Sequence, residues 1–179
     1  MVYIILGTGF EEIEAVAPVD ILRRGGVELS FAAVGEKKLV SGAHGIVIEA
    51  DVLFSETHPC GDDYIVIPGG MGGVNSIKGD KTAMDKIKAA AESGAKLAAI
   101  CAGPSVLAEL GLVEGQSITC YPGCESLMGG ANVDIARAVV CDSVITGRAP
   151  GSAIDFGVAL LSAIAGEETA ANVRTALVC

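Results

Sequence analysis

A cysteine stands between a short apolar segment and a turn that contains proline. Residues 95–100 are small and apolar without alternation, which is typical of a strand covered on both faces of a parallel sheet. Cys101 ends this strand, and Pro104 stands where the first turn of a helix tolerates proline. Unpaired N–H groups and the helix dipole favour an anion at such a junction, so we expect the Cys101 thiol to ionise more readily than a free thiol. A buried structural cysteine is the alternative, and the junction favours a nucleophile over it.

A glutamate lies on the apolar face of the first predicted helix, which spans Glu11 to Arg24. At 100° per residue, Glu14 projects from the middle of that face. A buried, unpaired carboxylate is costly or has a raised pKa, so we expect Glu14 to be functional and to lie near Cys101. The apolar face of this helix consists of Ala15, Ala17, Pro18, Ile21 and Leu22. The opposite, polar face consists of Glu12, Asp20, Arg23 and Arg24.

Four glycines occur within the five residues 69–73, directly after an apolar segment. Glycines at this density indicate unusual backbone angles or close approach to another group. A flexible loop is one interpretation. Because ligands of open α/β sheets bind at the carboxyl ends of parallel strands, we prefer a site wall formed by backbone atoms.

Predicted strands alternate with predicted helices along the chain and position Glu14, Cys101 and the glycine segment. Such alternation predicts a doubly wound α/β fold, with a mostly parallel sheet and helices on both faces, in a single domain over residues 1–179. Residues 40–51 are expected to form a hairpin or an excursion at the sheet edge, and Asp142-Ser143 a turn. The buried stripe of a later helix is expected to consist of Ile154, Val158, Leu161 and Ile164. The predicted strands are 2–6, 27–34, 64–68, 95–100, 117–121, 139–141 and 144–146, and the predicted helices are 11–24, 80–94, the segment after Pro104, 152–165 and 167–177.

Composition limits the partners of the protein. The chain has 179 residues, with 12 basic against 22 acidic side chains and a net charge of −10. This balance gives no electrostatic footprint for nucleic acid or for an anionic membrane. The longest apolar segments are too short to span a bilayer, and the start of the chain is typical of a first strand and not of a signal peptide. We therefore expect a cytoplasmic protein without nucleic-acid or membrane partners.

Two ligand-binding motifs are incomplete. Gly7-Thr8-Gly9 follows the first strand, but a dinucleotide motif requires glycine at position 12, where Glu12 stands. The six cysteines lack the density of a disulfide framework, so we expect free thiols. Cys120 and Cys124 form the one close pair, and without a second pair or a nearby histidine they do not predict a zinc site. We expect neither metal nor cofactor.

The motifs taken together resemble the ThiJ/PfpI superfamily, and within it they are most similar to the parkinsonism-associated deglycase branch. The resemblance covers nearly the whole chain. It implies a flavodoxin-like sandwich and a homodimer. It rests on residues 11–26, Ile67-Pro-Gly-Gly70, Ala98-Ala-Ile-Cys-Ala-Gly-Pro104, Ala149-Pro-Gly-Ser152 and Asp155-Phe156.

The resemblance also implies roles for individual residues. Cys101 matches the nucleophile of the elbow, Glu14 matches a protonated glutamate beneath it, and the backbone N–H groups of Gly70 and Ala102 match the oxyanion donors. We expect the substrate pocket to be lined by Glu11, Gly69 and Tyr121.

Two positions depart from the family's patterns. Peptidase-like members carry histidine immediately after the cysteine, and Ala102 in that position disfavours proteolysis. Some deglycase-like members have histidine where this chain has Tyr121, which leaves the general base open. His44 and His58 both lie outside the elbow and the glycine segment.

Three functions remain open at this point. The first is a cofactor-free enzyme of the glyoxalase III or deglycase type, which acts through Cys101 on methylglyoxal, glyoxal or early glycation adducts. The second is a stress protein whose Cys101 is oxidised as a redox sensor. The third is an inactive amidotransferase-like domain.

Overall fold

The computed structural model describes residues 1–142 and 144–179 and has a central sheet of seven strands. The strand order is β10-β11-β7-β6-β1-β2-β5. All pairings are parallel except that of β10 with β11. The mostly parallel, doubly wound α/β fold is therefore confirmed. The strands of this sheet are β1 (Val2–Leu6), β2 (Leu29–Ala33), β5 (Val52–Leu53), β6 (Tyr64–Ile67), β7 (Lys96–Ile100), β10 (Ala138–Cys141) and β11 (Val144–Gly147).

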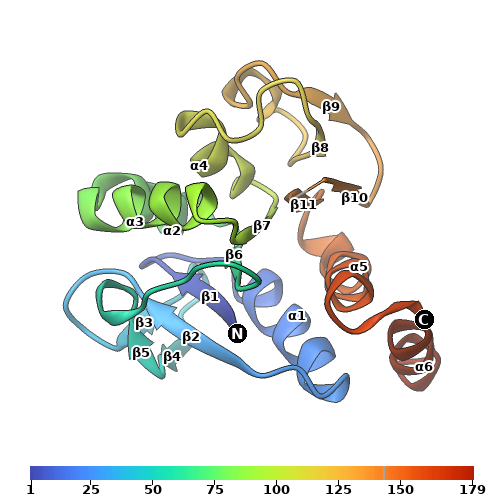
Figure 1. Cartoon of the computed structure of the whole chain (residues 1–179). Helices are drawn as coiled ribbons and strands as arrows, with labels where there is room; N and C mark the ends of the chain where they lie inside the picture. Colours follow the sequence, from blue (N-terminus) through green and yellow to red (C-terminus); the bar gives the residue numbers. More distant parts are fainter. Residues whose placement is uncertain (143) are drawn as a thin grey trace.

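Helices cover both faces of the sheet (Figure 1). One apolar cluster joins the sheet to α1, α5 and α6, and the other joins it to α2, α3 and α4. The sheet is thus buried on both sides, which explains the absence of alternation in its central strands. The helices are α1 (Glu12–Arg24), α2 (Met71–Gly79), α3 (Lys81–Glu92), α4 (Pro104–Glu109), α5 (Ala153–Ala165) and α6 (Glu167–Ala176).

Short elements lie beside the main sheet. The predicted hairpin over residues 40–51 forms from β3 (Leu39–Ser41) and β4 (Val47–Glu49), which pair antiparallel. The strand predicted over residues 117–121 is β8 (Ser117–Thr119), and it pairs in parallel with β9 (Asn132–Asp134) in a separate small sheet that contacts β10 and β11. Among the described residues, short 3-10 helices follow β5 (Phe54–Glu56), β8 (Glu125–Leu127) and β11 (Pro150–Ser152).

Three sequence-based predictions need correction, and one lies partly outside the described residues. The glycine segment of residues 69–73 is not a loop throughout, because α2 begins within it at Met71. Glu12 is buried and not outward, because its carboxylate accepts hydrogen bonds from another loop. Ile154 is 43% exposed, because the buried face of α5 is formed instead by Phe156, Gly157, Leu160 and Leu161 together with Ala153. The predicted turn at Asp142-Ser143 includes Ser143, which lies outside the described residues.

The strand order reverses next to β1. After β2 and β5 on one side of β1, the chain crosses to β6 on the other side. The carboxyl ends of β1, β6 and β7 consequently meet at one edge of the sheet, where ligands of open α/β sheets bind. The segments that follow these three strands carry Glu14, Gly69 and Cys101.

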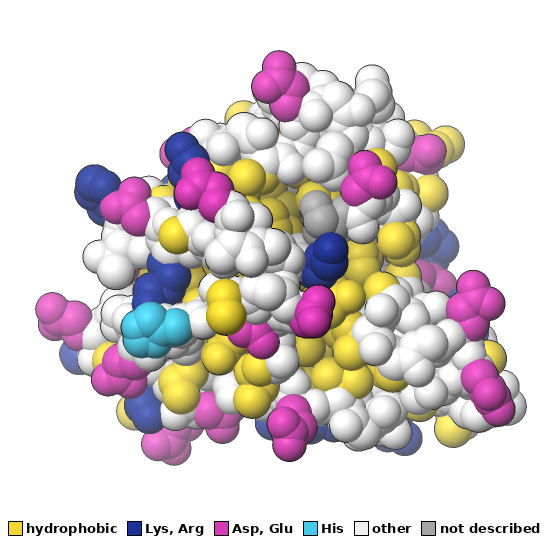
Figure 2. All heavy atoms as spheres, in the orientation of Figure 1, with side chains coloured by type: hydrophobic (Ala, Val, Ile, Leu, Met, Phe, Trp, Pro, Cys, Tyr) yellow, Lys and Arg dark blue, Asp and Glu magenta, His cyan; other side chains and the backbone are white. Residues whose placement is uncertain are grey.

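Surface charge on the view of Figure 2 is mixed. Acidic side chains are scattered around this face, and the basic ones lie singly between them. This face therefore presents no broad basic patch of the kind that binds nucleic acid. Among the residues the structure describes, no helix has both the length and the apolar character needed to cross a membrane.

Gly7 allows α2 to approach the end of β1. A Cβ atom at this position would collide with the backbone carbonyl oxygen of Gly73 and lie 3.0 Å from Cβ of Ser76. We expect Gly7→Ala to lower the free energy of unfolding by about 1–3 kcal/mol, because a backbone clash cannot be relieved by a change of rotamer. Urea-induced unfolding measures the loss. Gly79→Ala is the control, since a Cβ there would meet nothing within 4 Å, and equal stability of the two variants would contradict this packing.

Candidate functional site

Cys101 lies at a strained turn between β7 and α4. Its φ angle of 66° is in the left-handed region, which costs a residue other than glycine about 1–2 kcal/mol. Two hydrogen bonds hold this conformation: the Cys101 N–H donates to the carbonyl of Gly147 (2.9 Å), and the Tyr121 N–H donates to the carbonyl of Cys101 (2.9 Å). The adjacent strand and the loop after β8 thus hold the left-handed conformation of Cys101, which was not predicted from the sequence.

Glu14 lies beneath the elbow and is fully buried. Its Oε2 atom accepts a hydrogen bond from the Gly69 N–H at 2.7 Å. Its Oε1 atom is also buried and has no hydrogen-bond partner among the described residues. Burial raises the pKa of Glu14 to about 7, against the lowering effect of its contacts with Cys101 and Gly69. Glu14 therefore keeps its proton to a higher pH than a solvent-exposed glutamate does.

The thiol environment differs from the sequence-based expectation. Burial raises the pKa of Cys101, and the Glu14 carboxylate raises it further, whereas the N–H groups of Ala102 and Gly70 lower it. The expected effect of the helix dipole does not dominate, because Cys101 is only 9% exposed and lies beside the Glu14 carboxylate. Ionisation of the thiol is therefore coupled to the protonation state of Glu14.

Two backbone N–H groups, from Gly70 and Ala102, lower the pKa of the Cys101 thiol. Gly70 precedes α2 with a φ angle of 82°, which a glycine adopts without strain. The Gly69–Gly70 backbone is held from two sides, since the Glu11 N–H donates to the Gly69 carbonyl at 3.0 Å while the Gly69 N–H binds Glu14. The two predicted oxyanion donors thus lie beside the predicted nucleophile.

The predicted pocket residues surround the same point. Glu11 is half-buried at the start of α1, Gly69 lies between Glu14 and Cys101, and the Tyr121 side chain is 46% exposed beside the elbow. The structure therefore brings all seven sequence-predicted site residues together, from the ends of β1, β6, β7 and β8.

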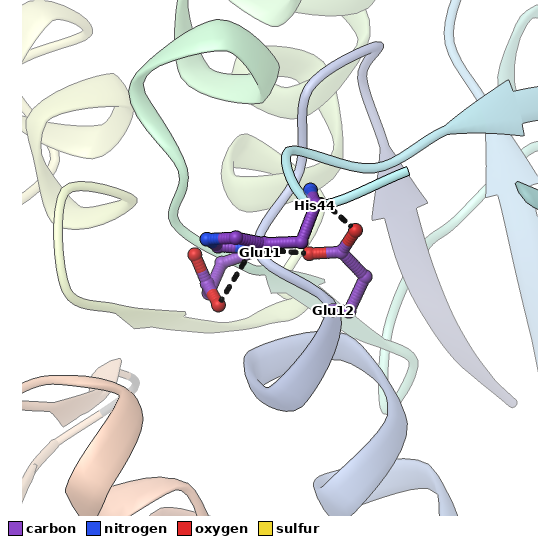
Figure 3. A group of neighbouring side chains, drawn as sticks. All are labelled: Glu11, Glu12 and His44. Atoms are coloured by element: carbon purple, nitrogen blue, oxygen red, sulfur yellow. Dashed lines mark hydrogen bonds and ion pairs between the residues drawn. The ribbon is translucent and has the colours of Figure 1, made fainter. Parts of the chain in front are cut away.

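The sequence did not predict the role of Glu12. Figure 3 shows Glu11, Glu12 and His44 together at the start of α1. The Glu12 carboxylate accepts hydrogen bonds from the backbone N–H groups of His44 (2.7 Å) and Ile46 (3.3 Å), and it lies 2.9 Å from Nδ1 of His44. Although burial opposes the shift, these bonds lower the pKa of Glu12 to about 2. The contact spans 32 residues of sequence, so no local pattern indicates it.

The same three residues bring ligand-type atoms within 4.8 Å of one another. Both Glu12 oxygens are already hydrogen-bonded, and the contact with Glu12 raises the pKa of His44, as do the charges of Glu11 and Glu12. We therefore interpret this group as an ion pair that holds the loop of residues 41–46 against the start of α1.

Known proteins share the sequence pattern and the fold of this chain. The model of the DJ-1/PfpI family matches residues 1–163. The chain belongs to the DJ-1/PfpI family. The crystal structure of Drosophila melanogaster DJ-1beta superposes with a TM-score of 0.91 at 30% identity, covering 99% of this chain and 96% of the other. The fold and the resemblance predicted from the sequence are both confirmed.

Several curated relatives share most of the chain. The Parkinson disease protein 7 homolog of Danio rerio is 31% identical over 98% of this chain and 95% of its own length. A deglycase of Pyrococcus abyssi is 31% identical over 84% of this chain and 90% of its own length. Protein DJ-1 homolog B of Arabidopsis thaliana is 36% identical over 95% of this chain, which spans only 39% of that relative. The family thus includes a protein named as a deglycase.

Gly69 leaves no room for a side chain at the centre of the site. An added Cβ would collide with Oε2 of Glu14 and lie 2.7 Å from Cβ of Cys101. We expect Gly69→Ala to slow alkylation of Cys101 at pH 7 roughly tenfold, because Glu14 and the Gly70 N–H must move away from the sulfur. Limiting iodoacetamide followed by peptide mass spectrometry measures the rate at each cysteine.

The exposed cysteines serve as internal references in that experiment. A protonated Glu14 donates a hydrogen bond to the Cys101 thiolate instead of repelling it, so in the native protein we expect Cys101 to be labelled before Cys60 and Cys179, which are both exposed. Gly151→Ala is the matched control, because a Cβ there meets nothing within 4 Å. Native labelling of Cys60 ahead of Cys101 would contradict the assignment of an activated thiol.

Proposed function

We propose that the protein is a cofactor-free enzyme of the glyoxalase III or deglycase type, with Cys101 as its nucleophile. The observation that supports this most directly is that three polar groups near one sulfur each shift its pKa: the Gly70 N–H, the Ala102 N–H and the Glu14 carboxyl group. A thiolate and an oxyanion both require such donors. The name of the Pyrococcus abyssi relative agrees with this activity.

The proposed reaction starts with a shared proton. A protonated Glu14 donates its Oε1 hydrogen to the Cys101 thiolate, which gives the buried, unpartnered oxygen a role. The thiolate adds to the aldehyde carbon of methylglyoxal, and the carbonyl oxygen receives the Glu14 proton to form a hemithioacetal. The N–H groups of Gly70 and Ala102 stabilise the oxyanion during this step.

The second half of the reaction moves hydrogen between adjacent carbons. The Glu14 carboxylate removes the C–H proton of the hemithioacetal carbon and returns it to the neighbouring carbon, while the hydroxyl proton passes to the neighbouring oxygen. The product is a thioester of lactate with Cys101. Water hydrolyses this thioester: one of its hydrogens restores the proton shared by Cys101 and Glu14, and the other is released to solvent as the lactic acid ionises to lactate.

Lactate formation tests the proposal. We would incubate the native protein with methylglyoxal, without added cofactor, and quantify lactate against time. Lactate in excess over protein supports an enzyme. Loss of methylglyoxal without lactate, together with a mass increase of two oxygen atoms on Cys101 after peroxide treatment, would favour the redox sensor instead. If neither lactate nor oxidation of Cys101 were observed, the inactive amidotransferase-like domain would be the remaining function.

We extend the proposal to the class of substrate and to the location of the protein in the cell. Ala102 after the nucleophile disfavours a peptidase, and we propose a small reactive carbonyl as substrate. The six cysteines are free thiols in the described structure, which agrees with the reducing cytoplasm as its location. We also propose that the whole chain acts as one domain.

A homodimer is the proposed assembly. Exposed apolar side chains occur on the first turns of α1 (Ile13, Val16) and on the neighbouring β3–β4 hairpin (Ile46, Val47), and such a patch marks an interface. We expect native protein to sediment as a dimer, and Val16→Glu to shift it toward monomer because it places a charge in the contact. Val140→Glu, on a strand at the edge of the sheet, is the control for an exposed valine. A native monomer at all concentrations would contradict the dimer.

A further inference from the structure

Two further cysteines lie on either side of Tyr121. Cys120 follows β8 and is 1% exposed, and Cys124 is half-buried. Both are free thiols, and both side chains pack into the apolar cluster that also contains Ile118 and Met128. The reaction proposed above uses neither of them.

The backbone between them folds back on itself. The Cys124 N–H donates to the Tyr121 carbonyl at 2.9 Å, which closes a four-residue turn. Pro122 and Gly123 occupy its central positions, and Gly123 has a φ angle of 97°, as the third position of a type II turn requires. The turn reverses the chain and brings Cys124 back toward Cys120.

Electrostatics agree with this proximity. Burial raises the pKa of Cys120 to about 11, with further contributions from Glu125 and Cys124, while Arg148 lowers it. Burial and Glu125 also raise the pKa of Cys124. Both thiols are therefore largely protonated at neutral pH, so their oxidation is slow there and faster in alkaline solution.

We propose that Cys120 and Cys124 are a second redox site, which forms a reversible intrachain disulfide independently of Cys101. The oxidant is a small-molecule disulfide such as oxidised glutathione. Cys124, the more accessible thiol, attacks it, and one glutathione leaves as the thiol. Cys120 then attacks the Cys124 sulfur of the mixed disulfide and releases the second glutathione, so that two protein thiols are oxidised and one disulfide is reduced.

The disulfide would restrain the wall of the candidate site. Tyr121 lies between the two cysteines, and its N–H donates to the Cys101 carbonyl. A covalent ring across residues 120–124 limits local opening of this segment. We expect hydrogen exchange of the Tyr121 amide to slow roughly tenfold in the oxidised protein.

Peptide mapping tests the proposal. Native protein is incubated with oxidised glutathione at pH 8.5, blocked with iodoacetamide, and cleaved with trypsin and a glutamate-specific protease. Cleavage after Glu114 and Glu125 isolates residues 115–125, which contain Cys120 and Cys124 and no other cysteine. We expect this peptide without alkylation and lighter by two hydrogen atoms, and dithiothreitol should restore both alkylation sites.

Variants separate the proposed pair from other outcomes. Cys101→Ser should form the same disulfide at the same rate. Cys120→Ala should stop at the mixed disulfide of glutathione with Cys124, and Cys124→Ser should leave Cys120 reduced. Two glutathione adducts on the native peptide, two alkylated cysteines at every oxidant concentration, or dependence on Cys101 would each overturn the proposal.

Discussion

Replacing Cys101 with serine is expected to abolish lactate formation from methylglyoxal, with a loss on the order of a thousandfold or more. Serine has nearly the same size, so the strained elbow and its bonds to Gly147 and Tyr121 can persist. Its hydroxyl group does not ionise near neutral pH, and the donors of Gly70 and Ala102 then have no anion to stabilise. Lactate release with time, for both proteins at equal concentration, is the measurement.

Cys60→Ser is the matched control for this substitution. Cys60 is exposed and lies far along the chain from the elbow, so the variant should retain native turnover. A Cys101→Ser protein with substantial lactate formation and an unchanged fold would refute the nucleophile, and it would redirect attention to the pair of Cys120 and Cys124.

Substitutions of Glu14 are expected to separate proton transfer from stabilisation of the thiolate. Gln at this position keeps an oxygen to accept the Gly69 N–H and gains an N–H group toward Cys101, but it cannot exchange a proton. We expect Glu14→Gln to retain thiolate near neutral pH while turnover falls at least roughly a hundredfold. Glu14→Leu removes the donor as well, so it should lose both thiolate and turnover.

Thiolate absorbance near 240 nm against pH distinguishes the two variants, with Cys101→Ser as the blank. The native curve should contain two coupled steps, because Glu14 and Cys101 share a proton. A native thiol titration and native turnover in the Glu14→Leu protein would make Glu14 a structural residue, and the proposed mechanism would fail.

The pH dependence of stability follows from the same carboxyl group. The pKa of Glu14 is raised from 4.5 to about 7 in the folded protein, so its ionisation opposes folding. Its contribution to stability is complete below pH 4.5 and is lost as the pH rises through 7. Relative to native protein, Glu14→Leu should therefore gain stability between pH 5 and pH 8, by roughly 3 kcal/mol at most. Urea unfolding at both pH values measures the difference.

Local patterns in the sequence determined the class of the fold and the identity of the central residues. Continuous apolar strands that alternate with amphipathic helices require a parallel sheet buried on both faces, and the structure has one. Glu14 was recognisable because 3.6-residue periodicity places it on an apolar face, and Cys101 because it joins a strand to a helix. Both inferences need only neighbouring residues.

Tertiary structure alone decided the properties that depend on distant parts of the chain. The left-handed conformation of Cys101 is held by Gly147 and Tyr121, and the buried position of Glu12 depends on a loop 32 residues away. The prediction of a lowered pKa for the Cys101 thiol was wrong for the same reason. A helix dipole can be inferred from local sequence, whereas the burial of the thiol and its contact with the Glu14 carboxylate arise only when β1, β6 and β7 pack side by side. Desolvation and charge act through space, so their balance is set by packing and not by position along the chain.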